Sequence, residues 1–264
     1  MSYAYVRTER SGNVGLIVLS DVSGKNALRP QTMQELCQAT DELIAAPDVH
    51  AIVLAADGRH FCAGADYGFL KQLATAPTAD AVDQIYRHFQ GAVRRIYHSG
   101  KPTVAAIDGA AITVGCELAL ACDFRIVTER AFFQESWIRV GLLPALGGMY
   151  LLPKLVGLSR AKDMVLRAQA ISGREALQIG LATELVDAEQ LRGRAIELAA
   201  ELAALPHRAY ALAKEGLHQG LGSTLEREWP AAIAAQATLL ASPDFQAATQ
   251  RIPDKTSDSA ASRG

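Results

Sequence analysis

Two turns that contain glycine carry the residue types that acid–base chemistry needs. The first is residues 61–66, Phe-Cys-Ala-Gly-Ala-Asp, and the second is residues 108–117, which begins Asp-Gly and ends Gly-Cys-Glu. The second turn leads into a predicted helix, whose free N–H groups and dipole favour negative charge. Glu117 falls one turn into that helix, where a carboxylate can act as a general base or acid beside a stabilised oxyanion. The alternative is that Glu117 is an ordinary first-turn residue favoured by the helix dipole.

Other chemistries have less support. No GxGxxG or Gly-Lys-Ser/Thr pattern indicates a phosphate-binding loop. No pair of cysteines has CxxC spacing and no histidine cluster lies beside them, which predicts no metal site and no disulfide framework. We expect four buried, reduced thiols, at Cys37, Cys62, Cys116 and Cys122. His60, next to the first turn, is a weaker candidate base, since nearness to a motif is a poor guide to function.

The charge pattern excludes some classes of partner. The formal net charge is -2 and the lysines and arginines are scattered, so the basic stripe of a nucleic-acid-binding protein is missing from the sequence. The N-terminal Met-Ser-Tyr-Ala-Tyr-Val-Arg has no apolar signal core, and the longest apolar runs are too short to span a bilayer. We therefore predict a cytoplasmic protein that binds neither nucleic acid nor a membrane.

Apolar runs alternate with helical patterns in the first half of the chain. Buried strands are predicted at residues 14–19, 51–56, 103–107 and 124–127, with a hairpin partner for the first at 5–9. Helices are predicted at residues 30–45, 79–97 and 115–122. This order favours right-handed parallel crossovers, and strands that are apolar throughout are typical of a sheet with helices on both faces. Ligands bind outside the carboxyl ends of such strands, where both turns lie.

The second half of the chain is alanine-rich and reads as helical. Helices are predicted at residues 151–156, 160–167, 175–179, 189–205, 206–219 and 225–241. The predicted organisation is thus an α/β core at residues 1–195, a helical C-terminal region at 196–252, and a disordered polar tail at 253–264.

Both turns resemble those of the enoyl-CoA hydratase/isomerase (crotonase) family, and the resemblance covers nearly the whole chain. Similar segments occur in order at residues 24–28 (Gly-Lys-Asn-Ala-Leu), 61–66, 101–109, 115–123, 141–148, 170–176, 180–182 and 242–245. The resemblance implies a crotonase-like ββα-repeat core with a C-terminal helical trimerisation region, assembled as a homotrimer or as a hexamer of two trimers. It also implies an acyl-CoA thioester substrate and no separate cofactor, because CoA is part of the substrate.

The resemblance also assigns roles to residues. In such proteins the thioester oxygen accepts two backbone N–H groups, which fall here on Ala65 and Val114, and Glu117 is the acid–base group. Each such donor is typically worth about 2.7–4 kcal/mol to the transition state. CoA would run along the first turn, with Lys25 near its phosphates. The substrate-binding residues expected on this basis are Lys25, Cys62, Ala63, Gly64, Asp66, Trp137 and Leu142.

Two positions depart from the family pattern. Trp137 stands where hydratases of the family carry a second glutamate, and an indole offers one N–H donor but no exchangeable acid. Glu135 is two residues away and is not expected to replace it. Related 4-chlorobenzoyl-CoA dehalogenases have a tryptophan here, but their nucleophilic aspartate would fall near Ala145. Val114 replaces a glycine, and its branched Cβ makes a positive φ costly.

Three functions follow from this resemblance. The first expectation is hydration of a 2-enoyl-CoA through an enolate held by the two N–H groups. The alternative reaction is double-bond isomerisation, in which Glu117 alone takes a proton from one carbon and returns it to another. The third possibility is a homologue that binds acyl-CoA without turnover.

Overall fold

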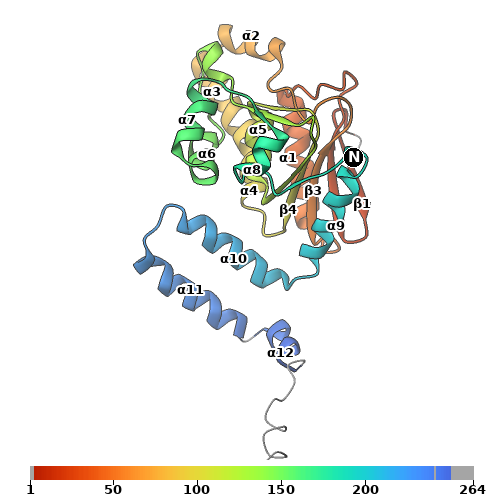
Figure 1. Ribbon diagram of the computed structural model, residues 1–264, viewed down its shortest axis with the longest axis vertical. Helices are drawn as coiled ribbons and strands as arrows, with labels where there is room; N and C mark the ends of the chain where they lie inside the picture. The colour runs from red at the N-terminus through yellow and green to blue at the C-terminus, as the bar shows by residue number, and fades with distance from the viewer. Residues whose placement is uncertain (1–2, 241, 251–264) are drawn as a thin grey trace, which may run out of the picture. The chain divides into compact units, whose positions relative to one another are not determined.

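A computed structural model describes residues 3–240 and 242–250, and the chain divides into two compact units, Met1–Leu205 and Pro206–Gly264 (Figure 1). The sequence prediction placed the boundary between residues 195 and 196, inside helix α9 (Leu191–Ala203). Because α9 packs against the main sheet, it belongs to the first unit. The tail predicted at residues 253–264 lies outside the described residues.

The main sheet of the first unit has the strand order β1-β2-β3-β4-β6-β9. Its strands are β1 (Val6–Ser11), β2 (Val14–Leu19), β3 (Ala51–Ala56), β4 (Thr103–Ile107), β6 (Phe124–Val127) and β9 (Glu184–Leu185). The β1–β2 pair is an antiparallel hairpin and all other pairs are parallel, as the alternation of strands and helices predicted. The four strands predicted as buried coincide with β2, β3, β4 and β6.

The first unit contains further helical segments in addition to α9, most of them short. They are α1 (Pro30–Ala45), α2 (Tyr67–Thr75), α3 (Thr78–Gln84), a π-helical segment η1 (Ile85–Gln90), α4 (Gly91–Tyr97), α5 (Val114–Ala121), a 3-10 turn η2 (Trp137–Val140), α6 (Gly148–Val156), α7 (Leu158–Leu166) and α8 (Gly173–Gln178). The helix predicted at residues 79–97 corresponds to α3, η1 and α4 in succession.

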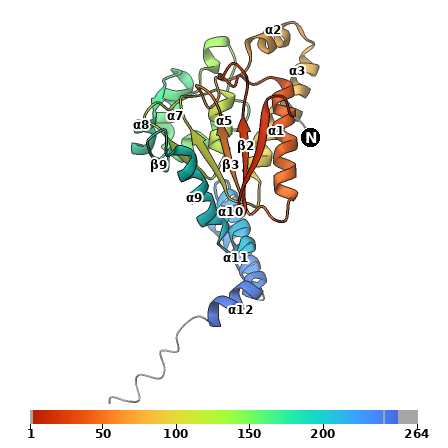
Figure 2. The same cartoon turned by 90° about the vertical axis from the view of Figure 1, so that its right-hand side faces the viewer.

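Helices cover both faces of the main sheet (Figure 2). Along β2, Ile17 and Leu19 belong to one apolar cluster with Met33 of α1, whereas Leu16 and Val18 belong to a second cluster with residues of α9. Since both faces of the strand are buried, the whole of β2 is apolar and shows no alternation with polar residues.

A second, three-stranded sheet was not predicted. It consists of β5 (Ala110–Ile112), β7 (Phe132–Gln134) and β8 (Ile171–Ser172), with β5 and β7 parallel and β8 antiparallel to β7. Strands of two or three residues are too short to show a hydrophobic period, so sequence analysis overlooks them. Helix α2 was also missed, although the Asp66 side chain caps it by accepting the N–H of Phe69 at 3.0 Å.

The second unit contains three helices in its described part: α10 (His207–Gly220), α11 (Leu225–Leu240) and α12 (Pro243–Gln250). The first two correspond to the helices predicted at residues 206–219 and 225–241. Among the described residues of both units, no helix combines the length and the apolar character that crossing a membrane requires.

Candidate functional site

The two turns singled out in the sequence are bonded to each other. Cys62 pairs with Ala111 of β5 in a parallel bridge: its N–H donates to the Ala110 carbonyl at 2.8 Å, and its own carbonyl accepts the Ile112 N–H at 3.0 Å. His60 supports the same contact, since its Nδ1 lies 3.2 Å from the Ala110 N–H. The ring of His60 therefore helps to hold the two turns together.

Two glycines allow this close approach. Gly64 has a φ of +96°, and a Cβ atom placed on it would lie 2.5 Å from Thr113 Oγ1. A Cβ atom on Gly115, in the first turn of α5, would lie 2.5 Å from the Cβ atom of Cys62. Either atom would overlap its neighbour, so any larger residue would push the two turns apart.

The backbone N–H groups of Ala65 and Val114 are free to bind a ligand. Within the described residues, neither N–H donates a hydrogen bond, and both residues line the same cavity. The positive φ that valine tolerates poorly is adopted by Thr113 instead, with φ 48° and ψ -110°, while Val114 keeps a negative φ as the first residue of α5. The replacement of glycine by valine therefore leaves the donor at residue 114 intact.

Glu117 is buried on the same helix, with 1% of its surface exposed. Its Oε1 atom accepts the backbone N–H groups of Leu146 at 2.8 Å and Gly148 at 2.9 Å, and its Oε2 atom lies 3.3 Å from Trp137 Nε1. Gly148 allows this close approach, because a Cβ atom at that position would lie 3.2 Å from Oε1 and 3.0 Å from the Pro144 Cβ atom, closer than most such contacts. The carboxyl group thus has a defined orientation from three donors.

Burial raises the pKa of Glu117 from 4.5 to about 7, against the opposing effect of the N–H groups of Gly148, Leu146 and Trp137. A carboxyl group with a pKa near neutrality is well suited to both accepting and returning a proton at physiological pH. Burial therefore gives Glu117 a pKa suited to acid–base chemistry, which a solvent-exposed first-turn glutamate would not have.

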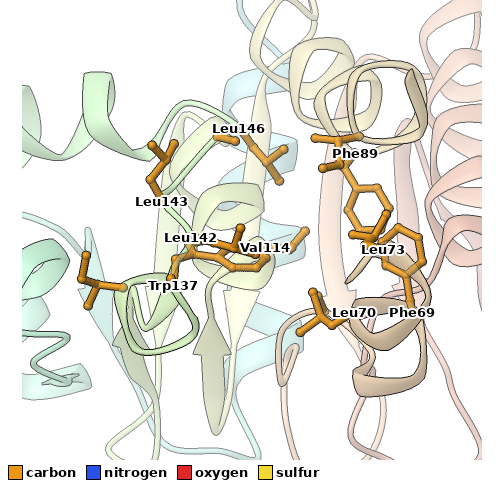
Figure 3. A pocket seen from close by; sticks show the side chains of 14 residues that line it. Phe69, Leu70, Leu73, Phe89, Val114, Trp137, Leu142, Leu143 and Leu146 are labelled. Carbon is orange, nitrogen blue, oxygen red and sulfur yellow. The ribbon is translucent and has the colours of Figure 1, made fainter. Parts of the chain in front are cut away.

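Trp137 occupies η2 and is 9% exposed. Its indole N–H points at Glu117, and its ring lines the cavity next to Val114 (Figure 3). The residue that replaces the second family glutamate is thus a hydrogen-bond donor to the first one. It is also part of the wall of the cavity.

Glu135 is a second buried carboxyl that sequence reasoning set aside. It follows β7, is 0% exposed, and neither of its oxygens has a hydrogen-bond partner in the described part of the chain. Burial, and then the charge of Glu117, raise its pKa well above the usual 4.5, which favours the neutral form of Glu135. Like Glu117, it lines neither of the two cavities near Trp137, but among the described residues it has no bond to a residue of the cavity wall such as the bonds of Glu117 to Leu146 and Trp137.

The cavity beside Val114 has a volume of about 440 Å³. Its walls come from the first turn, from α2 and η1, and from η2 and the loop that follows it (Figure 3). The lining residues are apolar apart from the indole nitrogen: Ala65, Phe69, Leu70, Leu73, Ile85, Phe89, Val114, Trp137, Ile138, Gly141, Leu142, Leu143, Ala145 and Leu146. Glu117 lies directly behind this wall, since it is bonded to Leu146 and Trp137.

A smaller cavity of about 270 Å³ shares Ala65, Leu70 and Trp137 with the first. Its lining is more polar and includes Thr113, Gln134, Ser136 and Arg139. The two cavities meet at Ala65, one of the two residues with a free N–H group. A bound molecule with an oxygen at that N–H can therefore extend into either cavity, the larger with an apolar lining or the smaller with a lining of polar and apolar residues.

The remaining predicted binding residues have different locations. Leu142 lines the large cavity, and Ala63 lines the small one. Lys25 is exposed on the adjoining loop, and its carbonyl accepts the Ala63 N–H at 3.0 Å. Cys62 is fully buried and supports the turn from behind, and burial raises the pKa of its thiol to about 12, which excludes it as a nucleophile near neutral pH.

Asp66 caps α2, so its carboxylate positions the turn and the helix rather than reacting. Sequence reasoning missed the two backbone donors at Leu146 and Gly148. The Gly147-Gly148 pair was a visible signal, since a glycine pair indicates close approach of another group, but the sequence does not show that the group is Glu117.

Comparison with known proteins places these features in one family. The family described as "Enoyl-CoA hydratase/isomerase" matches residues 9–257. "Probable enoyl-CoA hydratase" of Rhizobium meliloti (strain 1021) is 36% identical over 225 residues, which are 85% of this chain and 85% of the relative. Crotonyl-CoA hydratase of Syntrophomonas wolfei subsp. wolfei is 30% identical and covers 86% of each chain.

A solved structure gives the same result for the fold. The crystal structure of enoyl-CoA hydratase from Bacillus anthracis superimposes with a TM-score of 0.86 at 27% identity, over 93% of this chain and 95% of that one. The predicted fold class, an α/β crotonase core followed by C-terminal helices, is thereby confirmed. On the extent of these matches, the chain belongs to the enoyl-CoA hydratase/isomerase (crotonase) family.

Proposed function

We propose that the protein is an acyl-CoA enzyme in which Glu117 is the only proton-transferring side chain, and that its reaction is the shift of a double bond in an enoyl-CoA. The carbonyl oxygen of the thioester would accept the N–H groups of Ala65 and Val114. Both donors are unused by the described residues and belong to residues that line one cavity, and the adjacent positive end of α5 favours the enolate oxygen.

The observation that carries this proposal is the pairing of Glu117 with Trp137. In the reaction, Glu117 takes a proton from C2 of a 3-enoyl-CoA and the thioester becomes an enolate. The double bond then moves from C3–C4 to C2–C3 as the same proton returns to C4. One carboxyl group suffices for both transfers. Oε2 is the atom assigned to proton transfer, because it accepts a single long bond, from Trp137 at 3.3 Å, whereas Oε1 accepts two shorter ones.

Hydration of a 2-enoyl-CoA, the first expectation from sequence, is the second candidate. It is supported by the names of the relatives, which include crotonyl-CoA hydratase and enoyl-CoA hydratases. Hydration also needs a water molecule held beside the substrate double bond. Among the described residues, the side chains that line the large cavity offer one polar group, the indole N–H, and that group already points at Glu117, which favours isomerisation.

The two cavities suit the two arms of a thioester. The pantetheine arm of CoA carries amide groups that can bond to the mixed lining around Gln134 and Ser136. The acyl arm matches the apolar cavity. Lys25 is exposed next to this path and is a candidate partner for the CoA phosphates.

The test compares both reactions in the same preparations. Conversion of a 3-enoyl-CoA to the conjugated 2-enoyl-CoA raises the thioester absorbance, and hydration of a 2-enoyl-CoA lowers it. We expect isomerisation to dominate and Glu117→Gln to reduce its kcat by about 10²–10⁴-fold. In Trp137→Glu, a second carboxyl group is added, and hydration should rise relative to isomerisation.

Other results would rank the candidates differently. Faster hydration than isomerisation by the unaltered protein would make hydratase the better assignment. Saturable acyl-CoA binding with no turnover of either substrate, unaffected by Glu117→Gln, would identify a binding protein that has lost catalysis.

We also propose that the second unit joins copies of the chain into trimers or hexamers. Its described helices leave large apolar side chains exposed, among them Leu217 at 74%, Trp229 at 61% and Ile233 at 70%. Analytical ultracentrifugation of the full chain should then give three or six times the mass of one chain, and a monomer would refute this.

A further inference from the structure

The size of the apolar cavity bears on the substrate. At roughly 30 Å³ for each atom of water size in a liquid, 440 Å³ holds about fifteen non-hydrogen atoms. A crotonyl group has four carbon atoms and one oxygen. Such a short group would leave most of the cavity unfilled, and the lining side chains would lose the contacts that a longer chain provides.

The far wall of the cavity is built from α2 and η1. Phe69, Leu73 and Phe89 lie together on the side opposite Trp137 and Leu143 (Figure 3). The rings of Phe69 and Phe89 stack with centroids 5.2 Å apart and planes 5° from parallel, and these residues are 5% and 2% exposed. This wall is apolar and well packed, so it bounds the cavity on that side.

Two hydrogen bonds hold the far wall at a set distance from the reacting end. Asp66, the residue after Ala65, caps α2 through the N–H of Phe69. On the other side, Gln90 Nε2 of η1 donates to the Ala145 carbonyl at 2.6 Å, which joins η1 to the loop that lines the near wall. The length of the acyl group that fits is therefore determined by the fold.

We propose that this protein takes medium-chain aliphatic acyl groups, of about eight to twelve carbons, in preference to the crotonyl group. The inference rests on the proposed function, because it places the thioester at Ala65 and Val114. The carbonyl end occupies those two N–H groups, and the chain extends between Leu142 and Leu70 to the Phe69–Phe89 pair. No charged side chain lines the cavity among the described residues, so polar acyl groups are disfavoured.

The experiment measures binding of saturated acyl-CoAs to the full chain by calorimetry, using butanoyl-, hexanoyl-, octanoyl-, decanoyl- and dodecanoyl-CoA. Saturated thioesters cannot react, so binding is measured independently of catalysis. We expect Kd to fall by about fourfold for each added methylene, equivalent to about 0.8 kcal/mol, until the cavity is full near the decanoyl chain. A Kd that does not change with chain length, or is lowest for butanoyl-CoA, would overturn the proposal.

A pair of variants locates the effect. Leu73→Trp places an indole at the far end of the cavity, and the ratio of butanoyl-CoA Kd to decanoyl-CoA Kd should fall at least tenfold. Val82→Trp is the control, since Val82 is 59% exposed on α3 and does not line the cavity, and it should leave that ratio unchanged. An equal ratio in both variants would place the acyl chain elsewhere.

The outcomes separate this inference from the proposed function. If no acyl-CoA binds, both are wrong. If all acyl-CoAs bind alike, only the chain-length inference fails. If binding depends on chain length but no enoyl-CoA reacts, the inference holds and the proposed reaction fails.

Discussion

Replacing Glu117 by glutamine should make the protein more stable at pH 8 while it destroys activity. Glu117 is buried, and its pKa is raised from 4.5 to about 7 by loss of hydration. Ionising it in the folded protein therefore costs more than ionising it in the unfolded chain. At about 1.4 kcal/mol for each pH unit, the cost above pH 7 is about 3 kcal/mol.

Glutamine removes this cost but loses some hydrogen bonding. Its amide oxygen can still accept the N–H groups of Leu146 and Gly148. Its NH₂ group would face the indole N–H of Trp137, and two donors cannot form a hydrogen bond with each other. An unsatisfied buried donor costs about 1–3 kcal/mol. The net gain at pH 8 is thus about 1 kcal/mol, and below pH 4.5 the variant should be the less stable protein.

The assay is the free energy of unfolding by urea at pH values from 4 to 8.5, for both proteins. Between pH 4.5 and 7 the folded protein holds more protons at residue 117 than the unfolded chain does. The stability of the unaltered protein therefore falls as pH rises through this range, relative to Glu117→Gln. The difference between the two proteins should change by about 3 kcal/mol and then level off above pH 7.

Glu175→Gln is the matched control with the opposite sign. The backbone N–H and the hydroxyl of Ser172 lower the pKa of Glu175, so its ionised form stabilises the fold. That contribution is present above the unfolded pKa and is lost as pH falls. A stability difference for Glu117→Gln that does not vary with pH would refute the raised pKa, and with it the acid–base role built on that pKa.

Further predictions concern the reaction and its surroundings. The kcat/KM should fall tenfold for each pH unit below about 7, as Glu117 becomes protonated. Trp137→Phe removes a donor to the charged carboxylate and should shift this acidic fall in kcat/KM to a pH about one unit higher. An unshifted pH profile would show that the indole N–H is not bonded to Glu117. Gly64→Ala should reduce kcat by about 10²-fold or more by displacing the Ala65 N–H, while Gly12→Ala, which also has a positive φ but no neighbour within 4 Å, should leave kcat unchanged. Glu135→Gln should stabilise the protein more at pH 8 than at pH 5, because the pKa of Glu135 is raised and its ionisation opposes folding. The free energy of unfolding by urea, measured for both proteins at both pH values, checks this.

Much of the fold was predictable from sequence because the main strands are long and apolar. The runs at residues 14–19 and 51–56 could be identified as buried strands, since helices cover both faces of the sheet and no polar alternation is needed. The second sheet and α2 were not predictable in the same way. Their formation depends on partners far along the chain, such as the pairing of Ile112 with Gln134, and their own sequences carry no period.

The candidate site was also only partly predictable from the sequence. The sequence itself specified a helix that begins near residue 114, a glutamate one turn inside it, and a glycine turn at residues 61–66, because these depend on local backbone preferences. Only the tertiary structure brings the N–H groups of Leu146 and Gly148 to Glu117, and places the indole of Trp137 against its other oxygen.

These long-range contacts decide the chemistry. Desolvation raises the pKa of Glu117, and desolvation depends on every group packed around the carboxyl, which no single stretch of sequence contains. The volume of the acyl cavity has the same origin, since α2, η1 and the loop after η2 each supply part of its wall. Residue types and local backbone therefore determined which groups are available, whereas their protonation state and the space beside them are properties of the packed fold.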